Sequence, residues 1–192
     1  HVDILIAHDI EYADPDVVFG EGIPTLHELK RAGKTRFVGV SGYPLELLDH
    51  ASQRVGVDVI MSYSHYCLND TTLGRFAPAW RERGIGLISA SPLSMGLLTA
   101  APPDWHPAPP ELRAAAARAV EHCDERGVDL PFLAMQFALN EPPVDSTMTG
   151  TSRPANLEAN LAALTTPIDE ALLDEVLDIF APVKDLAWQS GW

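Results

Sequence analysis

The sequence predicts an α/β fold in which parallel strands alternate with helices. Short runs rich in β-branched residues alternate with longer amphipathic runs, whose apolar residues recur about every three positions. This alternation is the pattern of a parallel sheet wrapped by helices. The 192 residues include 46% hydrophobic residues, enough for a sizeable core, and no linker or break in composition marks a second domain.

The individual elements follow in chain order. Residues 2–7, 36–40, 57–63, 86–90 and 144–149 are predicted to be strands. Apolar residues about three apart, beginning at Ile23, predict a helix that ends at Gly33, since glycine commonly follows a helix. Similar spacing predicts helices over residues 45–55, 73–83, 111–126, 131–139, 154–164 and 170–179.

Residues 92–110 interrupt the alternation. The later part of this segment contains Pro102, Pro103, Pro107, Pro109 and Pro110. Proline lacks a backbone N–H and breaks regular structure, so the segment cannot be a helix or strand. Its length is typical of a functional loop that follows a strand.

Five βα units are visible, whereas a closed TIM (β/α)8 barrel has eight units and about 250 residues. We therefore expect residues 1–192 to form a single incomplete barrel domain, the C-terminal five units with strands 4 to 8. The chain begins at His1, directly at a strand and without Met, which indicates a fragment. Two open sheet edges would favour aggregation, so we expect a longer molecule or a homo-oligomer that covers them.

Composition restricts the partners. The net charge is −14 with 13 Lys plus Arg, so no basic patch is available for nucleic acid or an anionic membrane, and small neutral substrates are favoured. Cys67 and Cys123 have neither the spacing of a metal site nor that of a disulfide framework, so no metal is expected. No apolar run approaches the length of a membrane helix, and a reducing cytoplasm is the predicted location.

His8 directly follows the first predicted strand. In a barrel of this kind, the residues at the carboxyl ends of the strands carry the chemistry. By itself, a histidine at this position is more often structural than catalytic. The residues after it, Asp9 and Glu11, are candidates for binding sugar hydroxyls or for plain solvated surface.

Five sequence blocks together resemble the aldo-keto reductase superfamily, and within it the group of L-galactose and aldose 1-dehydrogenases. The blocks are VDILIAHDIE (2–11), GKTRFVGVSGYPL (33–45), VDVIMSYSHYCLND (57–70), GIGLISASPLSMGLL (84–98) and TGTSRPANLEANLAAL (149–164). They occur in the order of the family's fourth to eighth strands. The resemblance covers essentially the whole chain.

The resemblance implies an NAD(P)-dependent oxidoreductase. It implies hydride transfer between nicotinamide and the anomeric carbon of an aldose of the L-galactose, L-fucose or D-arabinose type, which gives a lactone. His8 would be catalytic and would orient the substrate oxygen. The family's catalytic Tyr, Lys and Asp are expected before His1, so the fragment alone should be inactive. The alternative is a non-enzymatic, cofactor-binding regulatory or associating subunit of the same fold.

The resemblance also implies cofactor positions near the second and third strands. Ser41 matches a serine that holds the nicotinamide carboxamide, and Gly42 replaces the family's asparagine beside it. Tyr63 falls where the family usually has glutamine, with His65 a weaker candidate. Strand alternation predicts that Tyr63 and His65 lie on the same side.

The remaining implied cofactor positions lie in the last two blocks. The loop after the fourth strand would pass over the pyrophosphate and includes Ser91, Pro92, Leu93, Met95 and Gly96. The turn and helix start after the fifth strand form an anion site with Gly150, Thr151, Ser152, Arg153, Asn156 and Asn160. Asn156 stands where NADP-dependent relatives have an arginine, which favours NAD, although Arg153 leaves NADP open.

Overall fold

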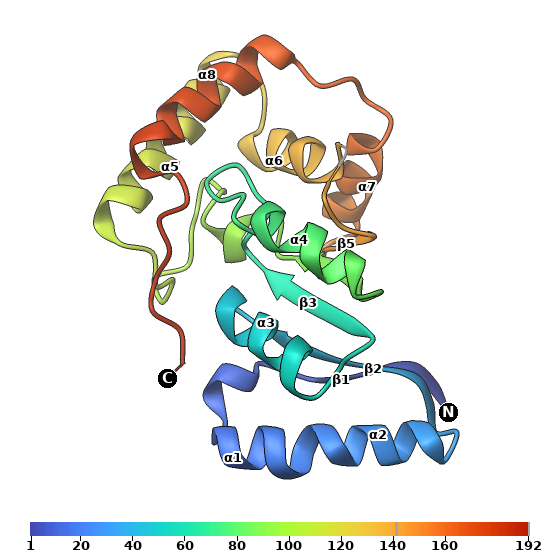
Figure 1. Cartoon of the computed structure of the whole chain (residues 1–192). Coiled ribbons are helices and arrows are strands. Elements are labelled where there is room, and N and C mark those ends of the chain that lie inside the picture. Colours follow the sequence, from blue (N-terminus) through green and yellow to red (C-terminus); the bar gives the residue numbers. More distant parts are fainter. Residues whose placement is uncertain (141, 192) are drawn as a thin grey trace.

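The computed structural model describes residues 1–140 and 142–191, and it contains one parallel sheet of five strands (Figure 1). The strands lie side by side in chain order, so each βα unit places its strand next to the preceding one. Their bounds are β1 Val2–Ala7, β2 Thr35–Gly42, β3 Val59–Tyr63, β4 Gly86–Ala90 and β5 Ser146–Met148. The predicted parallel α/β architecture is confirmed.

Eight α-helices in the described residues connect and cover these strands. They are α1 Pro15–Val17, α2 Ile23–Arg31, α3 Leu45–Arg54, α4 Leu73–Glu82, α5 Pro110–Glu125, α6 Leu130–Leu139, α7 Pro154–Ala163 and α8 Glu170–Phe180. All seven predicted helices are present, with ends that differ by one or two residues. A turn of π-helix at Val18–Gly22, joined to α1, was not predicted.

Two predicted strands are shorter than expected. The third begins at Val59 instead of residue 57, and the fifth covers only Ser146–Met148. Asp145 marks the approach to the fifth strand, where its carboxylate accepts a hydrogen bond of 2.7 Å from the Leu87 N–H. The Asp145 carboxylate thus takes the place of a backbone acceptor for the Leu87 N–H. A sequence pattern of apolar residues does not reveal such a contact.

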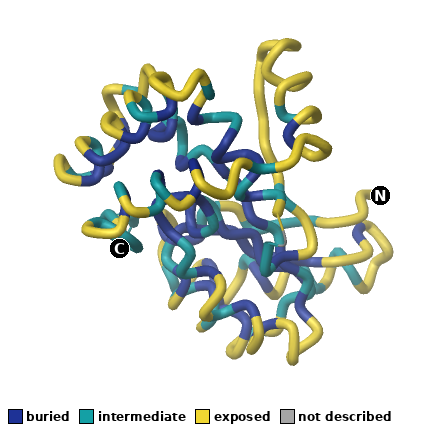
Figure 2. Tube along the Cα trace, turned by 90° about the horizontal axis from the view of Figure 1, so that it is seen from above, coloured by how far each residue is buried: buried dark blue, intermediate teal, exposed yellow. Residues whose placement is uncertain are grey.

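The hydrophobic core has two clusters. One joins the sheet to α2, α3 and α4 and includes Ile23, Leu48 and Trp80, none of which is measurably exposed. The other lies among α5, α6 and α8, where α5 and α8 run side by side. Figure 2 shows buried residues concentrated along the central strands and on the inner sides of the helices.

Two aspartates link elements by hydrogen bonds. Asp58 links α2 to the sheet, and Asp49 links α3 to α4. Asp58 accepts hydrogen bonds from Lys30 Nζ at 2.6 Å and from the Val38 N–H at 2.9 Å. Asp49 on α3 accepts from the Trp80 indole at 2.9 Å and from Arg83 at 2.7 Å. Burial alone would raise the pKa of both carboxyls, but these donors hold each pKa below its ordinary value.

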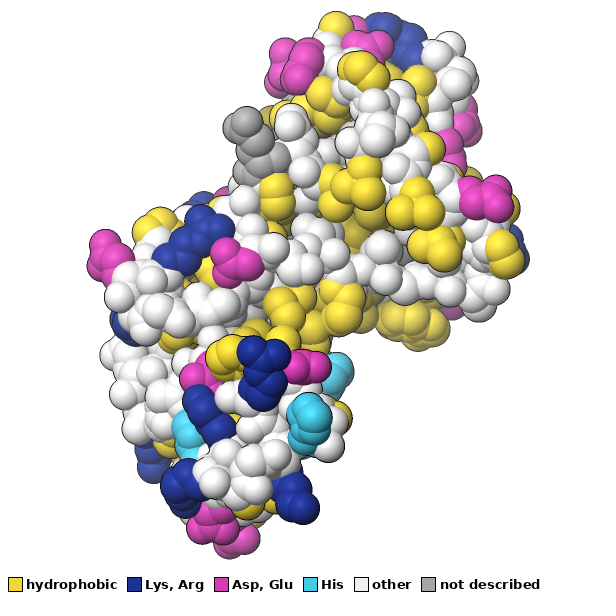
Figure 3. Space-filling view, turned by 90° about the vertical axis from the view of Figure 1, so that its right-hand side faces the viewer, with side chains coloured by type: hydrophobic (Ala, Val, Ile, Leu, Met, Phe, Trp, Pro, Cys, Tyr) yellow, Lys and Arg dark blue, Asp and Glu magenta, His cyan; other side chains and the backbone are white. Residues whose placement is uncertain are grey.

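Hydrophobic side chains are exposed near both edge strands of the sheet. Figure 3 faces the right-hand side of the molecule as drawn in Figure 1, and hydrophobic side chains gather across its middle. The exposed large hydrophobic residues of β1, β2, β5 and α7 are Val2, Ile4, Phe37, Met148, Leu157 and Leu161. Strands β1 and β5 are the two edges of the sheet within the described residues. In the described part of the chain, no helix is both long and apolar enough to cross a membrane.

Replacing Gly39 with alanine tests the close approach of β2 to β3. A Cβ at Gly39 would lie 2.5 Å from the backbone oxygen of Val59, so the strands would have to separate. We expect Gly39→Ala to lower the free energy of unfolding by about 2 kcal/mol or more, measured by urea denaturation.

Gly74→Ala is the matched control. Nothing lies within 4 Å of a Cβ at this position in α4, and alanine favours the helix, so stability should rise by about 0.5 to 1 kcal/mol. Equal effects of the two substitutions would contradict the close packing of β2 on β3.

Candidate active site at the carboxyl ends of the strands

All five strands are parallel, so the residues that follow them meet at one edge of the sheet, which we call the carboxyl edge. Three of these residues have left-handed backbone conformations: Asp9 with φ 51°, Ser64 with φ 60° and Ser91 with φ 56°. Such conformations cost on the order of 1 kcal/mol or more in residues other than glycine and are concentrated at functional sites. The carboxyl edge is therefore the candidate site.

His8 and Ser41 lie close together on this edge. The His8 side chain is 68% exposed, and its Nδ1 lies 3.1 Å from Asp9 Oδ1. The Asp9 N–H donates a hydrogen bond of 3.1 Å to Ser41 Oγ. Ser41 is 1% exposed, and because its oxygen accepts from Asp9, its own proton remains available for another acceptor.

Glu11 is completely buried, which corrects both interpretations of this residue, as a group that binds sugar hydroxyls and as plain solvated surface. Its Oε1 accepts hydrogen bonds from the Tyr43 N–H at 2.9 Å and from the Tyr63 hydroxyl at 3.0 Å. Its Oε2 is buried without a hydrogen-bond partner. A Cβ at Gly42 would lie 2.6 Å from this oxygen, so the carboxylate occupies the space that a side chain at Gly42 would need.

Tyr63 and His65 both lie against the Tyr43 ring, at ring-centroid distances of 5.5 Å and 4.3 Å. Strand β3 ends at Tyr63, and the left-handed turn at Ser64 breaks the alternation. His65 is 5% exposed, its ring lies 4.3 Å from the ring of Tyr43, and its Nε2 donates to the Tyr43 carbonyl at 2.7 Å. His65 therefore holds Tyr43 through both its backbone carbonyl and its ring.

Asp70 extends the hydrogen-bond network that joins His65 to Tyr43. Its Oδ2 lies 3.1 Å from His65 Nδ1, and its Oδ1 accepts from the Thr72 hydroxyl at 2.6 Å. Burial of Asp70 alone would raise its pKa, but the hydrogen bonds from His65 and Thr72 hold the pKa below its ordinary value.

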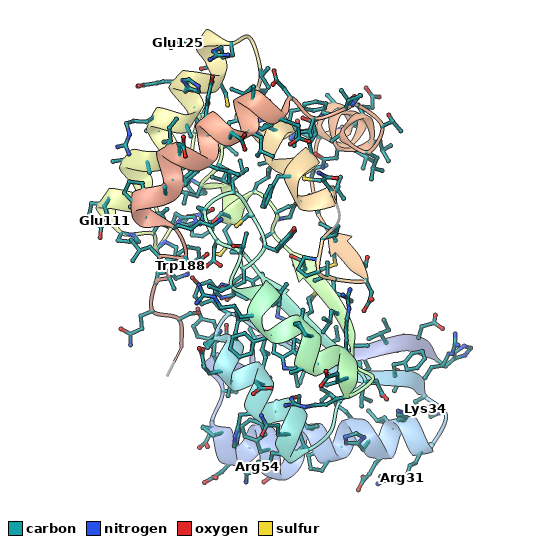
Figure 4. The ribbon with its side chains drawn as sticks, turned by 45° about the horizontal axis from the view of Figure 1, so that its top comes forward. Arg31, Lys34, Arg54, Glu111, Glu125 and Trp188 are labelled. Atoms are coloured by element: carbon teal, nitrogen blue, oxygen red, sulfur yellow. The ribbon has the colours of Figure 1, made fainter. Side chains whose placement is uncertain are left out.

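The C-terminal tail (residues 184–191) crosses the carboxyl edge (Figure 1). Asp185 anchors the tail, because its carboxylate accepts from the Thr71 N–H at 2.9 Å and from Arg75 at 2.6 Å. Further along, the Trp188 ring stacks on Tyr43 at 4.7 Å where the tail passes the strand ends (Figure 4). Sequence reasoning missed this contact of the tail, although the two tryptophans after the last predicted helix, Trp188 and Trp192, were a signal.

Two adjoining cavities follow the ends of β4 and β5, and we call them together the β4–β5 trough. The first, about 450 Å³, is lined by Ala90, Ser91, Pro92, Leu93, Met95, Gly96, Met148, Thr149 and Gly150. The second, about 270 Å³, includes Leu93, Thr99, Asp129, Phe132, Thr149, Gly150, Thr151, Asn156 and Asn160. The structure thus joins residues that the sequence separates by more than fifty positions.

The loop after β4 has an unusual backbone. Ser94, Met95 and Gly96 are consecutive left-handed residues, and a Cβ at Gly96 would lie 3.1 Å from the ring of Pro103. The N–H groups of Ser94 and Gly96 bond within the loop, to the carbonyls of Ser91 and Leu93. The loop therefore holds its own shape and presents side chains and only part of its backbone to the trough.

The predicted site residues fall into three groups. Ser91, Pro92, Leu93, Met95, Gly96, Gly150, Thr151, Asn156 and Asn160 line the trough. His8, Ser41, Gly42 and Tyr63 lie at the neighbouring strand ends, and Tyr63 is paired in register with Ala90, which lines the trough. Ser152 and Arg153 are exposed at the start of α7. Thr99, Asp129 and Phe132 were not predicted, because only the tertiary fold brings them to the trough.

No group of three or more His, Cys, Asp or Glu side chains within residues 1–140 and 142–191 is arranged to hold a metal ion. The site is instead a trough of apolar, small and amide side chains at the ends of β4 and β5, with the exposed His8 at the end of β1, on the other edge of the sheet. A parallel α/β domain with such a site at its carboxyl edge is characteristic of enzymes and binding proteins that take extended small-molecule ligands.

Comparison with known proteins identifies the family. The model of the aldo/keto reductase family matches residues 1–179. L-galactose dehydrogenase from Arabidopsis thaliana is 46% identical over all of this chain, and D-threo-aldose 1-dehydrogenase from a Pseudomonas species is 30% identical over 86% of it. The chain belongs to the aldo/keto reductase family.

Solved structures agree on the fold. An aldo-keto reductase from Bacillus halodurans, in its holo form, matches 98% of this chain with a TM-score of 0.68 and 21% identity. The chain covers 63% of that structure, and it covers 62% of the Arabidopsis protein.

The pKa of Asp70 predicts a pH dependence of stability. Because its pKa is lowered in the folded chain, the stabilisation is present above the unfolded value of 3.8 and is lost as the pH falls through the folded value. We expect Asp70→Asn to lower the free energy of unfolding by about 3 kcal/mol at neutral pH. This deficit should shrink as the pH falls below 3.8, in urea denaturation at a series of pH values.

Asp174→Asn, at an exposed position on α8, is the control and should change little. A deficit for Asp70→Asn that stays constant as the pH falls would contradict an ionised carboxylate in this network.

Proposed function

We propose that this chain forms the C-terminal five βα units, strands 4 to 8, of an eight-stranded (β/α) barrel, as one domain over residues 1–192. Two observations support this proposal. The sheet has two edges, β1 and β5, and exposed hydrophobic residues near both. The chain also matches 63% of a related structure while almost all of its own length is used in the match. Three further βα units would join β1 to β5.

We also propose that the complete barrel is an NAD(P)-dependent aldose 1-dehydrogenase that converts an aldose to its lactone. The observation that carries the proposal is the β4–β5 trough, which gathers residues from two distant sequence blocks that resemble the family's cofactor positions. The 46% identity to L-galactose dehydrogenase favours a sugar of the L-galactose, L-fucose or D-arabinose type. A cytoplasmic location is part of this proposal.

The trough suits an extended dinucleotide. Its two cavities adjoin through Leu93, Thr149 and Gly150, and the small residues allow a ligand to approach the backbone closely. Asn156 and Asn160 offer amide groups at the α7 end, where the helix begins without a side-chain cap. When bound, the oxidised nicotinamide would supply the hydride acceptor.

His8 would orient the sugar. Its Nδ1 faces Asp9 Oδ1, which leaves Nε2 as the ring nitrogen for the anomeric hydroxyl. That hydroxyl would lose its proton to a tyrosine supplied by the units that precede β1, and the anomeric carbon would lose hydride to give the lactone. Since those units are needed, the 192-residue chain alone should bind nucleotide and catalyse nothing.

The decisive experiment is an assay of the complete barrel polypeptide with L-galactose, L-fucose and D-arabinose, following absorbance of the reduced nicotinamide. We expect NAD+ reduction with at least one of these sugars. In the same polypeptide, His8→Ala should lower kcat about 100-fold or more, because the positioned imidazole is lost.

His1→Ala, at an exposed position outside the strand, should leave kcat unchanged. Nucleotide binding without turnover of any of the three sugars would reject the dehydrogenase and favour a non-enzymatic regulatory or associating subunit.

Asn156 is the basis for proposing NAD over NADP. Its side chain is exposed on the lining of the second cavity, and arginine there would place a cation where the resemblance locates the 2′-phosphate. We expect Asn156→Arg to tighten NADP+ binding about 10-fold with little change for NAD+, measured by isothermal titration calorimetry.

Glu158→Arg, also exposed on α7 and absent from the residues named for the trough, controls for a general gain of positive charge. If both substitutions tighten NADP+ binding equally, Asn156 does not select the cofactor.

A further inference from the structure

A buried histidine joins the proline-rich part of the loop after β4 to the lining of the β4–β5 trough. His106 is 4% exposed. Its Nε2 donates a hydrogen bond of 2.8 Å to the Ser94 carbonyl, and its Nδ1 accepts one of 3.0 Å from the Ala108 N–H. Ser94 begins a left-handed turn in which the next two residues, Met95 and Gly96, line the trough. His106 therefore contacts the backbone that shapes the trough.

The two hydrogen bonds of His106 fix its protonation state. A backbone N–H can only donate, so Nδ1 must present a lone pair to Ala108. A carbonyl oxygen can only accept, so Nε2 must carry the ring proton toward Ser94. The imidazole is therefore neutral, with its proton on Nε2. A second proton on Nδ1 would face the Ala108 N–H, and this hydrogen bond would be lost.

The surroundings of His106 also oppose a positive charge. Arg113 of α5 faces the segment, and its guanidinium donates to three backbone carbonyls there, including that of His106. The loop presents the Ser94 carbonyl and the tail presents the Trp188 ring, neither of which carries a charge. Burial and the charge of Arg113 lower the pKa of His106 below its ordinary value, although the bond to Ser94 acts in the opposite direction.

The C-terminal tail contacts the same histidine. The Trp188 ring packs edge-on against the His106 ring, with 5.1 Å between the ring centroids. Trp188 also stacks on Tyr43, and its backbone N–H donates to the Tyr43 hydroxyl at 3.3 Å. His106 thus lies between the tail and the loop that lines the trough. We call His106, Ser94, Ala108 and Trp188 together the His106 junction.

We propose that His106, in its neutral form, is a positioning residue for nucleotide binding, because the His106 junction holds the Ser94–Gly96 turn in the shape that forms the trough. This inference rests on the proposed function, since it takes a nucleotide as the ligand of the trough. His106 is not among the residues that line the two cavities, so it acts through the turn. Ser94 and Met95 are left-handed without being glycine, a conformation that persists only when other contacts determine it.

The first test follows the junction without any nucleotide, by NMR of the chain with ¹⁵N-labelled histidine and tryptophan. At neutral pH, the nitrogen shifts of His106 should show the proton on Nε2. As the pH falls, the His106 ring and the Trp188 indole should change with one shared midpoint, below the ordinary histidine value of 6.5. A proton on Nδ1 at neutral pH, or a Trp188 signal that does not follow His106, would contradict the junction.

The second test measures the affinity for NAD+ as a function of pH, by isothermal titration calorimetry. Only the neutral form of His106 completes the junction, so protons and NAD+ compete for the chain. The affinity should be constant above pH 6.5. It should then fall by about 10-fold for each pH unit below the His106 midpoint, because each unit lowers the neutral fraction to the same extent.

Two substitutions of His106 separate positioning from packing. His106→Ala removes both hydrogen bonds and should weaken NAD+ binding about 10-fold at neutral pH. Glutamine has one donor and one acceptor and does not titrate, so His106→Gln should restore most of this affinity and abolish the acid dependence. His122→Gln is the matched control, because it removes a titratable histidine of α5 that is bonded to Glu175. This control should keep the acid dependence of the unaltered chain.

The pH profile distinguishes positioning from a merely structural role, which would lower stability and leave the profile unchanged. Circular dichroism of each variant reports folding independently. An affinity that does not fall in acid, or an acid dependence that persists in His106→Gln, would overturn the inference and leave the proposed function standing. Absence of NAD+ binding at every pH would reject the proposed function, whereas the NMR titration would still decide whether the junction exists.

Discussion

The buried carboxylate of Glu11 is the contact on which the arrangement of the carboxyl edge depends. Parallel strands bring their carboxyl ends to one side but do not fix the side chains that follow them. Glu11 comes from the loop after β1, bonds to the backbone after β2 and bonds to the last side chain of β3. A buried carboxyl group without these donors would cost free energy, so the three strand ends are held in one arrangement.

A second set of contacts stabilises Tyr43, the residue after β2 to which Glu11 is bonded. Asp70 and His65 support the backbone of Tyr43, and the tail lays Trp188 on the Tyr43 ring. Tyr43 therefore lies between a buried polar network and the tail. The β4–β5 side is built differently, with a self-bonded loop and small residues that leave a trough. The carboxyl edge thus combines a rigid part around Tyr43 with an open part that suits a long ligand.

Much of the fold was predictable from the sequence. The strands follow from apolar β-branched runs, and the helices follow from the spacing of apolar residues and from Gly33 at the end of α2. The resemblance also selected residues such as Ser91, Gly150 and Asn160 that the structure brings to one trough. The roles of Glu11 and His65 were not predictable, because a local pattern does not reveal a buried partner on another strand. The left-handed backbone of Ser64, which ends the alternation of β3, was likewise not predictable from an apolar pattern.

The central claim is that a nicotinamide dinucleotide binds along the ends of β4 and β5. Hydrogen–deuterium exchange of the chain with and without saturating NAD+ tests this claim directly. The account predicts slower exchange in residues 93–98 and 149–157, with little change in α2 and α3. Unchanged exchange in both segments at saturating NAD+, or protection confined to α2 and α3, would contradict the claim.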